Sequence, residues 1–260
     1  RLLRGQTTDN DLFELRLKAM KMMFHWRKSP VRGLFGGKIE LIPHQMFVAH
    51  EVSNRQLPRV LLADEVGLGK TIEACLVLNR LLVCGRVKRV LILLPNSLVN
   101  QWFVELLRRF NLLFSIFDEE RCCAIETGQP GFNPFEDDQL LIADIDWLAK
   151  SPKRTEQAVQ APWDLLIVDE AHHLEWDSDK PSAKYLLAKA LAQRAGALLL
   201  LTATPQQLGL ESHFARLHLL DPARFSSFAA FKDETDQYKP VAKLCKKLID
   251  NKPLNIEELE

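Results

Sequence analysis

The sequence predicts an α/β domain: a mostly parallel central sheet covered on both faces by helices, in three layers. Short runs that are apolar at nearly every position alternate with amphipathic stretches, which is typical of parallel strands buried between two helical layers. The chain has 260 residues, of which 47% are hydrophobic and 26% charged, so it can bury a substantial core. Ligands bind beyond the carboxyl ends of such strands, and candidate chemistry is expected there.

Six segments have the composition of buried strands, and four stretches between them have helical spacing. The expected strands are residues 59–63, 89–94, 122–126, 139–143, 164–168 and 197–202. The expected helices are residues 71–84, 98–110, 145–150 and 182–194, preceded by an N-terminal helix over 9–28. Residues 130–138 contain two prolines and a glycine and are expected to form an exposed connection.

Charge and cysteine content narrow the classes of function. The 34 basic and 34 acidic residues cancel, so a nucleic-acid site has to be a local patch. The five cysteines match neither a zinc site nor a disulfide framework, and we expect reduced thiols. The sequence shows no signal-peptide pattern and no apolar run long enough to cross a membrane, which favours a cytoplasmic protein. The chain has no initiator Met, which we interpret as the mark of a fragment.

A glycine-rich turn between an expected strand and an expected helix has the features of a phosphate-binding loop. In residues 61–71, LLADEVGLGKT, Gly67 and Gly69 let the backbone turn tightly and bring its N–H groups close to phosphate oxygens. The helix N-terminus adds partial positive charge. Lys70 can reach the β- and γ-phosphates, and the Thr71 hydroxyl can ligate Mg²⁺. The expected nucleotide-binding residues are Asp64, Glu65, Val66, Gly67, Leu68, Gly69, Lys70 and Thr71.

Two further strand ends carry candidate catalytic and coupling groups. Asp169 and Glu170 follow the strand expected at 164–168, where Asp169 can hold Mg²⁺ and Glu170 can orient and deprotonate the attacking water. Thr202 and Thr204, in LLTATPQ, offer hydroxyls that could bond residues 169–172 and report nucleotide state. His172 is expected to couple these motifs, and His173, expected to point away from it, to serve packing.

In this order and spacing, DEVGLGKT, DEAH and LTATP resemble motifs I, II and III of the Swi/Snf-type ATPases of helicase superfamily two. Asp64 stands where phosphate loops usually begin with Gly, and the form DExGLGKT is typical of that family. Residues 41–50, LIPHQMFVAH, resemble its Gln motif, which places Gln45 beside adenine. Residues 91–102 and 139–147 occupy the places of motifs Ia and Ib, and the resemblance covers residues 41–238.

The resemblance implies a RecA-like lobe that binds ATP and Mg²⁺ and belongs to a double-stranded DNA translocase. The sequence is also similar to bacterial members associated with RNA polymerase, which implies that polymerase as a partner and a nucleoid-associated, cytoplasmic location. On this basis residues 1–38 form an N-terminal helix and linker from an upstream domain, 39–225 the ATP-binding lobe, and 226–260 a helical extension toward a second RecA-like lobe. The second lobe and its arginines are absent from these residues, so we expect ATP binding with poor hydrolysis.

Contacts with DNA are the less direct expectation. Asn96, Ser97, Asn100 and Gln101 follow the strand expected at 89–94, and their amide or hydroxyl groups suit phosphates. The motif Ib region reads ADIDW, which is acidic, so no DNA contact is assigned there. The basic runs at 86–89, 108–109 and 150–154 are expected to be solvated faces. Core or interface positions are expected for Trp102, Trp147, Trp163 and Trp176.

Two alternatives to a duplex translocase stay open at this point. A strand-separating helicase or a restriction-type DNA motor could carry the same DEAH sequence. The chain could also serve as a nucleotide-switched docking module for RNA polymerase.

Overall fold

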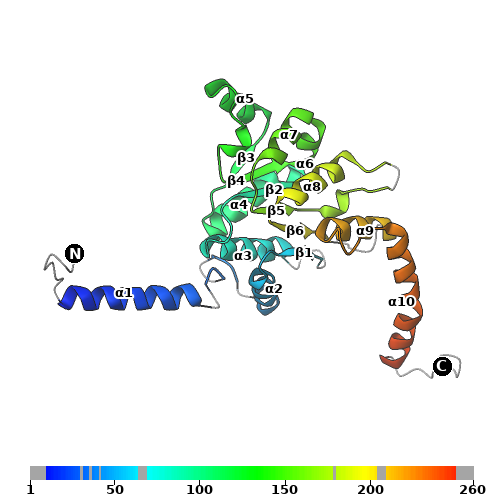
Figure 1. Ribbon diagram of the computed structural model, residues 1–260, viewed down its shortest axis with the longest axis horizontal. Helices are drawn as coiled ribbons and strands as arrows, with labels where there is room; N and C mark the ends of the chain where they lie inside the picture. Colours follow the sequence, from blue (N-terminus) through cyan, green and yellow to red (C-terminus); the bar gives the residue numbers. More distant parts are fainter. Residues whose placement is uncertain are drawn as a thin grey trace.

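The protein is described by a computed structural model that covers residues 10–29, 32–34, 37–40, 42–63, 69–177, 180–203 and 209–249 (Figure 1). Its helices are α1 (Asn10–Lys28), α2 (Pro43–Asn54), α3 (Lys70–Val83), α4 (Asn96–Phe110), α5 (Glu119–Gly128), α6 (Ile145–Lys150), α7 (Pro152–Gln160), α8 (Ala183–Arg194), α9 (Gly209–Leu220) and α10 (Phe228–Ile249). Its strands are β1 (Arg59–Leu62), β2 (Val90–Leu94), β3 (Ser115–Phe117), β4 (Leu140–Asp144), β5 (Leu165–Val168) and β6 (Ala197–Leu201).

The six strands form one parallel sheet in the order β1-β6-β5-β2-β4-β3, which confirms the predicted α/β class. Val168 of β5 pairs with Leu93 of β2 on one side and with Leu200 of β6 on the other. Leu62 of β1 pairs with Leu201 of β6. The carboxyl ends of these four strands therefore lie along one edge of the sheet, and the segments that follow them are brought together.

Successive residues of each strand point into two different cores. In β2, Val90, Ile92 and Leu94 pack with α2, α3 and α4, whereas Leu91 and Leu93 pack with α6, α7, α8 and α9. All five side chains are fully buried. Because both faces of the sheet are covered, as the layers in Figure 1 show, the strands lack the apolar–polar alternation of a half-exposed sheet.

The prediction of a strand at residues 122–126 is wrong. These residues lie in α5, and the edge strand β3 precedes them. The Asp118 side chain accepts a hydrogen bond from the Arg121 N–H at 2.8 Å, so a side-chain cap starts a helix just before the apolar run. Cys122 is buried, but the run that follows is largely exposed, as on the outer face of a helix. Helices α2, α5 and α7 were not among the predicted elements.

The connection at 130–138 was predicted to be exposed, and this is only partly correct. It contains a short 3-10 helix, Pro134–Glu136, and the Phe135 ring in that helix is fully buried. Phe135 packs against Phe117, with ring centroids 5.6 Å apart. The connection therefore also closes the core at the β3 edge of the sheet.

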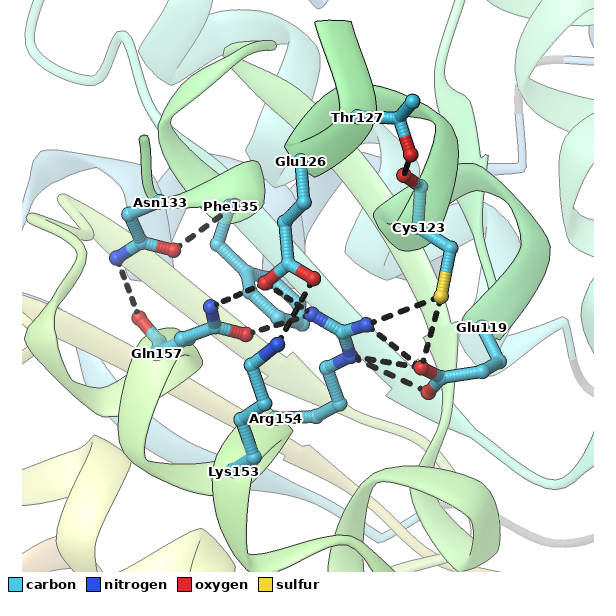
Figure 2. Close-up of polar contacts among 9 residues, drawn as sticks. All are labelled: Glu119, Cys123, Glu126, Thr127, Asn133, Phe135, Lys153, Arg154 and Gln157. Carbon is cyan, nitrogen blue, oxygen red and sulfur yellow. Dashed lines mark hydrogen bonds and ion pairs between the residues drawn. The ribbon is translucent and has the colours of Figure 1, made fainter. Parts of the chain in front are cut away.

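Arg154 contradicts the expectation that the basic run at 150–154 is a solvated face, because its side chain is only 2% exposed. Figure 2 shows its guanidinium between two acidic side chains of α5. Nη2 donates to Glu119 Oε1 at 2.6 Å, and Nη1 donates to Glu126 Oε1 at 2.7 Å. These hydrogen bonds hold the pKa of both carboxyls down at about 2. Arg154 thus ties α5 to α7.

The segment predicted as a linker lies partly against the body of the fold. Gly33 O accepts a hydrogen bond from Asn79 Nδ2 at 2.7 Å, and Lys38 N donates to Arg109 O at 2.7 Å. Leu34 is buried among residues of α3 and α4. By contrast, α1 projects away from the sheet, and residues 10–25 are exposed throughout (Figure 1). None of the helices in the described ranges combines the length and apolar character needed to span a lipid bilayer.

Candidate nucleotide-binding site

An open cleft of about 320 Å³ lies between the start of α3 and one face of α4, at the carboxyl edge of the sheet. Its lining consists of Gly69, Lys70, Thr71, Ile72, Leu98, Gln101, Trp102, Glu105, Arg109, Asp169 and Glu170. The structure thus brings the described part of the glycine-rich turn and the acidic pair to one cavity. Residues 64–68 and Thr204, which were predicted to take part, lie outside the described residues.

The turn that opens α3 depends on Gly69. Its backbone has φ 86° and ψ 34°, a left-handed conformation that glycine adopts without steric cost. A Cβ atom at this position would fall 2.3 Å from Gln45 Nε2. The Gln45 side chain, which is 4% exposed, therefore packs directly against the turn. The N–H groups of the first turn of α3 point out of the helix, which suits an anion.

Asp169 is held at both carboxylate oxygens. Oδ2 accepts a hydrogen bond from Trp102 Nε1 at 2.7 Å, and Oδ1 accepts one from the Glu170 N–H at 2.8 Å. Burial raises the pKa of Asp169, because the charged form loses hydration. The two hydrogen bonds and the charge of Lys70 act in the opposite direction and favour the carboxylate.

Glu170 has a left-handed backbone, with φ 49° and ψ 46°. A non-glycine residue in this region stores about 1–3 kcal/mol of strain, and such strain is concentrated at functional sites. Glu170 Oε2 lies 3.0 Å from His172 Nδ1. The expectation that His172 and His173 point apart is wrong, because their ring centroids are 4.1 Å apart.

The surroundings of His172 lower its pKa, first by burial and then through the charges of His173 and Arg216, while Glu170 acts in the opposite direction. Arg216, on α9, is fully buried, and the sequence analysis did not single it out. The available signal was a single arginine within the apolar face of HFARLHLL. Thr202 is also fully buried, and its N–H donates to Leu62 O at 3.0 Å, so it joins the ends of β6 and β1.

The candidate DNA contacts separate into two groups. Asn96 and Ser97 are exposed in the first turn of α4, as is Asn100 one turn further on, whereas Gln101 lines the nucleotide cleft. In the acidic motif Ib region, Asp144 caps α6 by accepting hydrogen bonds from the N–H groups of Asp146 and Trp147. That carboxylate therefore has a structural role.

The oxygen donors of the cleft fit a magnesium ion that also binds phosphates. The Thr71 hydroxyl and the Asp169 carboxylate line the same cavity, and Mg²⁺ prefers such hard ligands. Within the described ranges, no group of three or more His, Cys, Asp or Glu residues could hold a metal ion. Mg²⁺ at nucleotide sites is commonly bound by one or two protein ligands together with substrate phosphates.

A parallel sheet that carries a glycine-rich turn before α3 and an acidic pair after β5 on one edge defines a RecA-like nucleotide-binding lobe. Residues 22–252 match the family model described as SNF2-related domain, and the chain belongs to this family. It is 56% identical over 242 residues to the RNA polymerase-associated protein RapA of Vibrio campbellii, covering 93% of this chain and 25% of that protein. With the Photobacterium profundum protein of the same name the identity is 53% over 255 residues, covering 98% and 26%.

Two solved structures have the same fold. The Sulfolobus solfataricus SWI2/SNF2 ATPase core domain gives a TM-score of 0.62 at 20% identity, covering 86% of this chain and 43% of that one. The same core in complex with dsDNA gives 0.61 at 20% identity, covering 76% and 39%. The chain thus spans about a quarter of the length of the RapA proteins that it matches.

Proposed function

We propose that this chain is the ATP-binding lobe of an ATP-dependent motor that translocates on double-stranded DNA and acts on transcription complexes. The convergence of Gly69–Thr71 and Asp169–Glu170 on one cleft carries this proposal. Membership of the SNF2-related family supports the use of ATP. The names of the RapA relatives support RNA polymerase as a partner, and the Sulfolobus solfataricus complex with dsDNA supports duplex DNA as the track. A cytoplasmic location at the nucleoid is part of the proposal.

In this proposal the start of α3 binds the triphosphate. The backbone N–H groups of the turn and the Lys70 ammonium contact the phosphates, and the sequence motif assigns residues 64–68 to the same binding role. Thr71 and Asp169 hold Mg²⁺, which neutralises charge on the phosphate oxygens. Gln45 packs against Gly69, which supports a position for its amide at the adenine end of the nucleotide.

Glu170 is the proposed general base. It orients a water molecule toward the γ-phosphorus and accepts a proton from it, while the bond from the γ-phosphorus to the β–γ bridging oxygen breaks. His172, whose Nδ1 lies 3.0 Å from Glu170 Oε2, is the proposed positioning partner of that carboxylate. Together with Thr202 and Thr204, His172 is proposed to report the nucleotide state. Because Gln101 lines the cleft, we assign it to the nucleotide side and keep Asn96 and Ser97 as DNA contacts.

ATP hydrolysis by the full-length parent tests the proposal. We expect stimulation by duplex DNA in the wild type and none in Glu170→Gln, because the variant can bind nucleotide but has no base. Lys70→Ala should lose binding of a fluorescent ATP analogue. Absence of nucleotide binding by the wild type would refute the ATP-binding role, and absence of stimulation by duplex would refute the translocase.

The same proteins separate the two alternatives. Displacement of a strand from a forked duplex would favour a strand-separating motor. Polymerase binding that persists in Lys70→Ala, together with an ATPase rate that ignores DNA, would favour a docking module.

A further inference from the structure

A buried indole hydrogen bond joins the two sides of the nucleotide cleft. Trp102 Nε1 donates to Asp169 Oδ2 at 2.7 Å across 67 residues of sequence, and the Trp102 side chain is 1% exposed. The fold makes this contact possible because β2 and β5 are neighbours in the sheet. Since α4 starts two residues after β2 ends, its second turn lies beside the end of β5.

This bond determines how far the Asp169 carboxylate can turn. The other hydrogen bond to the carboxylate comes from the N–H of the adjacent residue, Glu170, which moves with the same backbone. Trp102 lies on a different element, so its hydrogen bond restricts rotation of the Asp169 carboxylate about the Cβ–Cγ bond. Each carboxylate oxygen can accept more than one hydrogen bond, so each retains capacity for a further partner in the cleft.

The chemistry of the donor suits a metal ligand. An indole N–H donates one hydrogen bond and carries no charge, so it orients Asp169 without cancelling the negative charge. A lysine or arginine at the same place would form an ion pair and compete with a cation. Partners of this kind around metal-ligating carboxylates commonly change metal affinity or activity about 10–100-fold when they are removed.

We propose that Trp102 is a positioning residue for the divalent cation of this site, acting through its hydrogen bond to Asp169. The inference rests on the proposed function, because it requires nucleotide and metal in the cleft. In this role Trp102 contributes no ligand of its own. It would hold the Asp169 carboxylate in one orientation in the cleft that Thr71 also lines.

Trp163 provides a matched control within the chain. Its side chain is 3% exposed, and its Nε1 donates to Ala158 O at 2.8 Å, in the core on the other face of the sheet. Phenylalanine at either position removes one buried indole hydrogen bond and leaves an aromatic ring. Both variants therefore lose one buried indole hydrogen bond, and they differ in the acceptor that is released.

The 260-residue chain is titrated with Mn²⁺ in the presence of a non-hydrolysable ATP analogue, and free Mn²⁺ is followed by electron paramagnetic resonance. We expect Trp102→Phe to weaken Mn²⁺ binding about 10-fold or more. Trp163→Phe should bind Mn²⁺ and the metal-free analogue at the wild-type level, and the loss of Mn²⁺ affinity in Trp102→Phe should exceed any loss of its affinity for the metal-free analogue. Equal Mn²⁺ affinity in the two variants would overturn the inference.

A second measurement uses the wild type and covers the case in which Trp102→Phe does not fold. Adding Mg²⁺ to the analogue complex should shift the Trp102 indole N–H resonance and leave that of Trp163 in place. An unmoved Trp102 signal would overturn the inference. A wild type that binds no nucleotide would overturn the proposed function and this inference together, whereas normal wild-type binding with no difference between the variants overturns the inference alone.

Discussion

Replacing Gly69 by alanine tests the geometry of the turn before α3. The new methyl group would fall 2.3 Å from Gln45 Nε2, 3.5 Å from Gln45 Cδ and 3.9 Å from Ile72 Cβ. The left-handed backbone costs an alanine about 1–2 kcal/mol, partly offset by about 0.4–1 kcal/mol from the stiffer unfolded chain. Displacing the buried Gln45 amide adds about 1–3 kcal/mol. We therefore expect Gly69→Ala to lower the free energy of unfolding by about 2–4 kcal/mol.

Gly131→Ala is the matched control. Gly131 has the same φ, 86°, and a Cβ there would have no neighbour within 4 Å. This variant should carry only the backbone strain, a net loss of about 1 kcal/mol. For a domain of this size each kcal/mol corresponds to about 2–4 °C in Tm, so we expect a fall of about 2–4 °C for Gly131→Ala and of about 4–16 °C for Gly69→Ala.

The collision with Gln45 is tested by thermal unfolding of four variants. These are Gly69→Ala, Gly131→Ala, Gln45→Ala and the double variant Gln45→Ala with Gly69→Ala. Because Gln45→Ala removes the amide that collides, the double variant should lose less stability than the sum of its single substitutions. A fluorescent ATP analogue should bind Gly131→Ala normally and Gly69→Ala weakly. Equal losses of stability in Gly69→Ala and Gly131→Ala, or strict additivity with Gln45→Ala, would refute the reasoning.

Three further outcomes are expected. Arg154→Met should lower the free energy of unfolding by about 1–3 kcal/mol. This is less than for a fully buried ion pair, because water can reach the carboxylates left behind. In the same urea titration, the double variant Glu119→Gln with Glu126→Gln should lose more stability, since the buried guanidinium would keep its charge without counter-ions. Acid should also separate these proteins. The depressed pKa values of Glu119 and Glu126 stabilise the fold above their ordinary value of 4.5, and this contribution is lost as the pH falls toward about 2, so Tm should fall more steeply there in the wild type than in Arg154→Met. Arg59→Met should lower the free energy of unfolding by about 2–4 kcal/mol, as measured by thermal unfolding. The Arg59 guanidinium donates to Ala192 O in α8 and to Leu219 O and Leu220 O in α9 at 2.8–3.1 Å. Arg59→Lys should have an intermediate stability, and a wild-type Tm for Arg59→Met would count against this role.

Buried parallel strands were the most predictable part of the fold. Residues 60–62, 90–94, 140–143, 165–168 and 197–201 are apolar at every position because helices cover both faces of the sheet. The failure at 122–126 has a local cause, since a single hydrogen bond to the Asp118 side chain changes the element that follows. A side-chain cap favours a helix where an apolar run favours a strand, and composition alone does not show which element forms.

The candidate site was predictable as far as strand ends determine it. Lys70, Asp169 and Glu170 lie together because each follows a strand of one parallel sheet. Trp102 was not predictable in the same way. Both Trp102 and Trp163 are buried, and only the three-dimensional structure shows that the Trp163 indole donates to a backbone carbonyl and the Trp102 indole to the Asp169 carboxylate.

The left-handed backbone of Glu170 affects the outcome of selecting variants of this chain for thermal stability. Asparagine and glycine adopt that conformation more readily than glutamate, so either would relieve strain while removing the proposed base. A screen for thermal stability alone would therefore enrich variants that are more stable but lack the proposed base. At this position, a screen has to measure ATPase activity and thermal stability together.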